Sequence, residues 1–206
     1  MSTVFENIIS GVWPGRFVWA DDLCVAFATI EPTSPGHVLV VPRCPYEAWT
    51  DAPSDVAAHL MKVARAIGLA QKAAFGVPRA GLAIAGFEVP HTHLHVIPLR
   101  DETDILLSKA TPASDDDLDA TMAALREALL AAGHTAHVPA TMSRLPRPLG
   151  TNPLSAHLVR AVSMDITTLT VAGIPAPRRL PARHCPHPGG ASRSQRLGCH
   201  ARTRHR

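Results

Sequence analysis

Apolar residues recur every three or four positions in two stretches of the chain, which is the spacing of one helix face. The first stretch begins at Ser54, an expected N-cap, and ends before Gly76; its apolar face comprises Val56, Leu60, Val63, Ile67, Ala70 and Ala74. The second begins at the expected N-cap Ser114, and its apolar face comprises Leu118, Met122, Leu125 and Leu129. The pattern therefore predicts two main helices, and Val4–Ile9 predicts one or two further turns.

Shorter segments rich in β-branched and aromatic residues, bounded by turn residues, predict strands. These segments are Phe17–Trp19, Leu23–Ile30, His37–Pro42, Leu82–Ala85 and His91–Ile97. Two strand sets with a helix between them and another afterwards are typical of an α+β domain. We therefore expect a mainly antiparallel sheet of about five strands in a domain spanning residues 1–135.

The remaining residues, 136–206, have a different composition. Residues 1–140 carry nine basic and sixteen acidic side chains, whereas residues 141–206 carry eleven arginines, one acidic residue and eight prolines. This composition, without a long periodic apolar segment, predicts a disordered Arg/Pro-rich tail. Its arginines could neutralise nucleic-acid phosphates, but the absence of interleaved aromatic residues disfavours that interpretation.

No segment resembles a targeting or membrane signal. The first residues lack a basic start followed by an apolar core, and no stretch reaches the roughly 18 to 20 apolar residues that span a bilayer. The four cysteines show no CxxC spacing. We expect a cytoplasmic protein that does not bind membranes.

Three histidines alternate in the segment His91-Thr92-His93-Leu94-His95. On a strand, alternate side chains lie on one face, so these imidazoles would line one surface at intervals of about 6–7 Å. A neutral imidazole is a good nucleophile towards phosphorus, and neighbouring imidazoles can donate a proton or offset phosphate charge. The spacing therefore indicates covalent chemistry on a phosphoryl group.

Two other interpretations of this segment remain open. Alternating histidines can ligate zinc and leave a coordination position for water, as in a metal-dependent hydrolase. They could also form a polar strand face exposed to solvent.

The segment resembles the signature of the histidine-triad family, His-φ-His-φ-His-φ-φ with φ apolar, and only Thr92 departs from it. The stretch from Phe27 to Pro42, with a Pro-rich turn before His37, is similar to the family's second hallmark, and Phe5–Ile9 to its N-terminal segment. The resemblance covers roughly residues 4–130 and is nearest to actinobacterial members. It implies a homodimeric nucleotidyl hydrolase or transferase with a purine nucleotide substrate.

The resemblance also implies roles for individual residues. His93 would be the nucleophile, His91 and His95 would flank the phosphate and leaving group, and His37 would support them. The residues that fall at the nucleotide pocket are Phe5, Ile8, Trp13, Phe27, Thr29, Ile30, Phe87 and Glu88. An apolar slot with aromatic walls also suits a flat purine.

Several of these positions depart from the family pattern. Thr29 stands where many members have an aspartate for the ribose, and Phe87 and Glu88 replace two polar residues near the phosphate or leaving group. The loop at Pro78–Gly81 is shorter than usual and lacks Asn-Gly. Members with structural zinc carry N-terminal cysteines, but Glu6 stands at the usual first position, so we expect no metal and no cofactor.

Two functions beside the metal-dependent hydrolase follow from these observations. The first is a hydrolase that cleaves at the α-phosphate of a nucleoside phosphoramidate, adenylylated amine or dinucleoside polyphosphate through a nucleotidyl-histidine. The second is a nucleotide-binding regulatory module with little turnover, because Phe87 and Glu88 would spoil the phosphate site.

Overall fold

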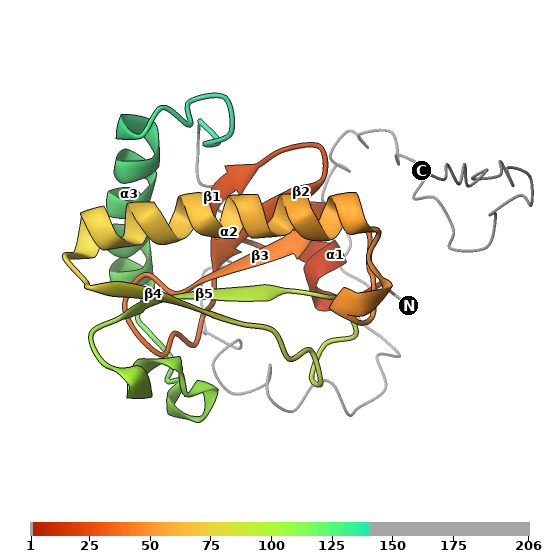
Figure 1. The fold of residues 1–206 in the computed structure, drawn as a ribbon, viewed down its shortest axis with the longest axis horizontal. Coiled ribbons are helices and arrows are strands. Elements are labelled where there is room, and N and C mark those ends of the chain that lie inside the picture. Colours follow the sequence, from red (N-terminus) through yellow and green to blue (C-terminus); the bar gives the residue numbers. More distant parts are fainter. Residues whose placement is uncertain (1, 141–206) are drawn as a thin grey trace, which may run out of the picture. The chain divides into compact units, whose positions relative to one another are not determined.

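A five-stranded antiparallel sheet with helices packed on it forms the fold (Figure 1). The computed structural model describes residues 2–140. The strands are β1 (Phe17–Ala20), β2 (Cys24–Ala28), β3 (Val38–Pro42), β4 (Arg79–Ala83) and β5 (Leu94–Leu99), in the order β1-β2-β3-β5-β4. The helices are α1 (Val4–Ile9), α2 (Ser54–Phe75) and α3 (Asp115–Ala131), with short 3-10 turns η1 (Trp49–Asp51), η2 (Glu102–Ile105) and η3 (Leu107–Lys109). The predicted α+β class is confirmed.

The two faces of the sheet carry separate apolar clusters because neighbouring strand residues point in opposite directions. On one face the main core is formed with α2 and α3; it includes Val40 of β3 and Leu94 and Val96 of β5. On the other face the apolar cluster beneath α1 consists of Phe5, Val25, Phe27, Leu39 and Val41. Leu39 pairs with His95, so His95 faces the α1 side. The alternation therefore places this histidine away from the main core.

The helix ends agree with the sequence patterns except at one cap. Ser114 accepts a hydrogen bond from the Asp117 amide, as an N-cap does, and Gly76 ends α2 with a left-handed φ of 61°. Ser54, however, is already the first residue of α2, and Pro53 occupies the cap position without a side-chain hydrogen bond. The prediction that Ser54 is the N-cap is therefore wrong by one residue, because Pro53 holds that position.

Two predicted strands lie at shifted positions. Arg79–Ala83 forms the edge strand, so the residues predicted as a short loop at 78–81 mostly belong to β4. The strand predicted at His91–Ile97 begins only at Leu94. The His91 amide donates to the Val89 carbonyl (2.7 Å), and the Thr92 amide donates to the Tyr46 carbonyl (2.6 Å). Because these two amides bond to Val89 and Tyr46, residues 91 and 92 do not pair with a neighbouring strand, and β5 begins after them.

The buried side chain of Gln71 connects α2 to both histidine-bearing segments. Its Nε2 donates to the carbonyls of Gly36 (2.9 Å) and Val96 (2.8 Å), while its Oε1 has no partner among the described residues. Gly36 has a φ of +93°, and a Cβ there would lie 2.2 Å from the Phe75 ring. Gln71 therefore fixes the turn that immediately precedes His37.

We expect Gln71→Ala to lower the free energy of unfolding by about 3 kcal/mol, because it removes two hydrogen bonds and leaves a cavity. Gln71→Leu fills the same space and removes the unpaired Oε1, so it should cost only about half as much. Urea denaturation of both variants measures the difference. Equal losses would show that the two hydrogen bonds, rather than packing, are what Gln71 supplies.

The described contacts continue slightly beyond residue 135. The Ala20 amide donates to the His137 carbonyl (2.8 Å), and the His137 ring stacks on Trp19 with centroids 4.6 Å apart. The predicted tail at 141–206 lies outside the described residues. Within residues 2–140, no helix combines the length and the hydropathy needed to cross a bilayer.

Candidate active site

Four histidines from two distant segments meet on the α1 side of the sheet. The ring centroids of His93 and His95 lie 4.9 Å apart, and those of His37 and His95 lie 5.2 Å apart. Phe5 of α1 contacts the rings of His91 and His93 edge-on, at 5.6 and 4.9 Å. The structure therefore brings together all four histidines that the sequence singled out.

One hydrogen bond fixes the tautomer of His93. Its Nδ1 lies 2.9 Å from the His91 carbonyl oxygen, which can only accept, so Nδ1 carries the hydrogen. In a neutral ring the other nitrogen, Nε2, then carries a free lone pair. No hydrogen bond occupies this Nε2 among residues 2–140. His93 is thereby prepared to act as a nucleophile through Nε2.

A chain of hydrogen bonds orients His37 and His95. The Thr33 amide donates to His37 Nδ1 (3.3 Å), so the hydrogen of a neutral His37 ring lies on Nε2. This Nε2 donates to His95 Nδ1 (3.0 Å). His95 then carries its hydrogen on Nε2, which makes that nitrogen a donor. Thr33 was not singled out from the sequence, because its role depends on a backbone amide.

His91 is fully engaged by protein atoms. Its Nε2 donates to the Pro42 carbonyl (2.8 Å), its Nδ1 accepts from Thr3 Oγ1 (3.0 Å), and the residue is 0% exposed. Its place differs from the expected position beside the phosphate, because no ring nitrogen is left for a ligand. Thr3 also forms a capping box with Glu6. The Thr-x-x-Glu spacing was a sequence signal for this cap, although not for the contact with His91.

Burial keeps the four imidazoles neutral. It lowers the pKa of His37 to about 3 and of His95 to about 4, with further lowering by neighbouring histidines. The pKa values of His91 and His93 are also lowered by burial, although backbone hydrogen bonds oppose the shift. Neutral rings at physiological pH retain the lone pair that a nucleophile needs.

The expected nucleotide-pocket residues divide into two groups. Phe5 and Phe27 belong to the apolar cluster, and Ile8 packs against it. Trp13 and Ile30 lie outside this cluster, and Ile30 is 38% exposed. The remaining three are the polar Thr29 and two residues of the loop before the histidines, Phe87 and Glu88.

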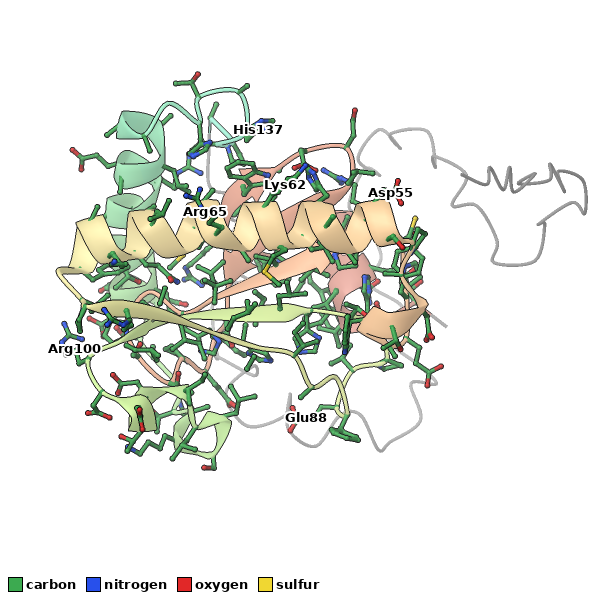
Figure 2. All side chains as sticks on the ribbon, viewed as in Figure 1. Asp55, Lys62, Arg65, Glu88, Arg100 and His137 are labelled. Atoms are coloured by element: carbon green, nitrogen blue, oxygen red, sulfur yellow. The ribbon has the colours of Figure 1, made fainter. Side chains whose placement is uncertain are left out.

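Of the other expected pocket residues, Phe87 and Glu88 are exposed, whereas Thr29 forms a hydrogen bond within its own turn. The Thr29 hydroxyl accepts from the Glu31 amide (3.3 Å), so it closes its own turn. Phe87 is 99% exposed, and Glu88 is also exposed in the same loop. Figure 2 shows Glu88 on the side of the sheet away from α2, which is the side of the histidines.

A second titratable cluster lies between the β1–β2 turn and α2. Ligand atoms of Asp21, Cys24 and His59 lie within 4.8 Å of one another, the one such set among residues 2–140. The Asp21 carboxylate accepts from Trp19 Nε1, His59 Nε2 and the amides of Leu23 and Cys24, each at 2.8 Å. These bonds satisfy the carboxylate, so the cluster fastens the turn to the helix.

Comparisons with known proteins agree with this geometry. The HIT domain model matches residues 10–102. An uncharacterized HIT-like protein of Methanocaldococcus jannaschii is 34% identical over 120 residues, which cover 56% of this chain and 92% of that protein. Adenosine 5'-monophosphoramidase HNT1 of Saccharomyces cerevisiae is 32% identical over 117 residues, covering 56% and 73%.

A solved structure supports the same relationship. A zinc-bound histidine triad family protein from Mycobacterium smegmatis is 28% identical, with a TM-score of 0.56 over 65% of this chain and 97% of that protein. The predicted HIT-like fold is therefore confirmed. The sequence relatives and the shared fold together show that this chain belongs to the histidine triad (HIT) family.

Proposed function

We propose that the protein is a nucleotidyl hydrolase or transferase that cleaves at the α-phosphate of a purine nucleoside phosphoramidate or dinucleoside polyphosphate. The observation that carries this proposal is the pair of available nitrogens: Nε2 of His93 with a lone pair and Nε2 of His95 with a hydrogen. A nucleophile beside a proton donor is what phosphoryl transfer through an enzyme intermediate requires. The phosphoramidase activity of the yeast relative supports the same reaction class.

The proposed reaction has two displacements at phosphorus. His93 Nε2 attacks the α-phosphorus and forms an N–P bond, while the bond from phosphorus to the leaving group breaks. His95 Nε2 gives its proton to the departing nitrogen or oxygen. Water then attacks the phosphorus, the N–P bond breaks, and the water proton returns to His95. His91 is a positioning residue, because its carbonyl holds the hydrogen of His93 Nδ1.

The metal-dependent alternative is disfavoured by the hydrogen bonds of the four rings. Both nitrogens of His37 and His91 and one nitrogen each of His93 and His95 are engaged. Two nitrogens remain, whereas catalytic zinc sites hold the metal with three protein ligands. A regulatory nucleotide-binding module remains an outcome of the test.

The test is an assay of the full chain with a fluorogenic adenosine phosphoramidate, with and without EDTA. We expect chelator-resistant turnover, and acid quenching should trap one nucleotidyl group on the peptide that contains His93. Nucleotide binding without turnover would instead support the regulatory module. Turnover abolished by EDTA would support metal-dependent hydrolysis and overturn the proposal.

We also propose that the protein forms a homodimer through β4 and α2. β4 is an edge strand of the sheet (Figure 1), and a strand edge presents unpaired backbone groups. A hollow beside it is lined by apolar residues of both elements, among them Met61, Leu69 and Leu82. These three side chains are 49%, 51% and 36% exposed. A second copy would cover them and join the two sheets.

We expect light scattering to give twice the 22.0 kDa chain mass, and Leu69→Glu to shift the protein to monomer. The carboxylate would be taken out of water in the interface, and this desolvation opposes association even though Arg65, Lys72 and Arg79 also line the hollow. Leu130→Glu is the matched control, because Leu130 is a similarly exposed leucine (44%) on α3. A monomeric wild type, or a dimer that survives Leu69→Glu and is lost in Leu130→Glu, would contradict this interface.

A further inference from the structure

The charged groups that act on the four histidines are all acidic. Glu6 acts on His91 and Glu88 acts on His93, and the neighbouring imidazoles that also act on the rings are neutral at physiological pH. No lysine or arginine among residues 2–140 hydrogen-bonds to any of the four rings. Among residues 2–140, a phosphate-bearing substrate therefore meets carboxylates, but no lysine or arginine that is bonded to the four rings.

Glu88 lies in the loop that immediately precedes the histidines, next to Val89. Val89 packs against the apolar cluster, and its carbonyl accepts from the His91 amide (2.7 Å). Glu88 is exposed and takes part in no hydrogen bond or ion pair with another described residue. This unpaired carboxylate would repel an anionic group and attract a cationic one.

Phe87 adds an apolar surface to the same loop. Its side chain is 99% exposed, the highest value among the exposed large apolar residues of the described chain. Gly86, with a φ of +87°, allows the turn that projects it. An aromatic ring beside a carboxylate can contact both parts of a ligand that is apolar and cationic.

We propose that Phe87 and Glu88 select substrates whose leaving group carries a second, cationic amine on an apolar or aromatic body. This inference rests on the proposed function, since it assigns the leaving-group side of the same site. The substrate class is a nucleoside phosphoramidate of a diamine, in which one nitrogen is bound to phosphorus and the other is an ammonium group. The ammonium supplies a positive charge that no lysine or arginine among residues 2–140 brings to the four rings by a hydrogen bond.

Two adenosine phosphoramidates of equal size test the proposal. One releases 4-(aminomethyl)benzylamine, which is cationic at its far end, and the other releases 4-ethylbenzylamine, which is not. We expect the wild type to favour the cationic substrate in kcat/KM by roughly fivefold at low salt, as for an exposed charge pair. The preference should shrink in 0.5 M NaCl, because salt screens exposed charges.

Variants assign the preference to the loop. Glu88→Gln should bring the ratio of the two kcat/KM values close to one, whereas Glu127→Gln, which removes an exposed carboxylate from α3, should leave the ratio unchanged. Phe87→Ala should raise KM for both aromatic substrates by about the same factor, since it removes the shared apolar contact.

The outcomes separate this inference from the proposed function. Turnover of both substrates with equal kcat/KM, or a preference that persists in Glu88→Gln, overturns the inference and leaves the hydrolase proposal standing. Absence of turnover for both substrates overturns the two proposals together. A preference lost only in Glu88→Gln supports the assignment.

Discussion

Replacing His93 with alanine is expected to lower kcat for an adenosine phosphoramidate by at least about a thousandfold. The variant lacks the one imidazole among residues 2–140 that has a free Nε2 lone pair and lies beside the proton-donating His95 ring, so the covalent route through an N–P bond is lost. Single-turnover kinetics with acid quenching measures both the rate and the nucleotidylated enzyme. Nucleotide binding should persist, because the apolar cluster under α1 is unchanged.

A second variant separates the loss of the nucleophile from a loss of structure. His93→Asn keeps an N–H that can donate to the His91 carbonyl, yet it has no imidazole lone pair. It should be as inactive as His93→Ala while unfolding at nearly the wild-type temperature. Substantial turnover by both variants would show that the nucleophile lies elsewhere, and recovery of turnover on adding zinc would favour metal chemistry.

The sequence predicted the elements whose patterns are local. The apolar faces of α2 and α3 are buried where the three-to-four spacing placed them, except at Ala74, which is half-buried, and all four residues of the predicted α3 face are less than 5% exposed. The alternation also agrees with the structure on β5, where Leu94 and Val96 lie in the main core while His95 faces the α1 side. These features follow from side-chain periodicity alone.

The details of the site depend on contacts between distant segments, which periodicity does not encode. The expectation that His91 lies on a strand failed because its own amide donates to the Val89 carbonyl and the Thr92 amide donates to the Tyr46 carbonyl, instead of to a strand partner. Its two ring partners, Thr3 and Pro42, lie 88 and 49 residues away. Gln71 likewise acts through backbone carbonyls, which carry no residue-specific signal.

Acidification from pH 7 to pH 5 is expected to lower the free energy of unfolding by about 4 kcal/mol through His37 and His95 alone. Their pKa values are near 6.5 in the unfolded chain but about 3 and about 4 in the fold, where burial disfavours the charged ring. Below pH 6.5 the unfolded state binds protons that the native state does not bind. Each histidine therefore costs about 2 kcal/mol over this interval.

Urea titrations at pH 5, 6, 7 and 8 test this, with His37→Gln as the variant that removes one titrating ring. The variant should show a shallower loss between pH 7 and 5, whatever its stability at pH 7. Asp21 does not change the stability between pH 7 and 5. Burial would raise the pKa of its carboxyl group, but hydrogen bonds lower it to about 2, so the stability that the ionised carboxylate contributes is lost only below about pH 4. A stability that is flat between pH 7 and 5 would mean that the rings accept protons in the native state. The neutral His93 lone pair on which the proposed chemistry depends would then be absent at mildly acidic pH.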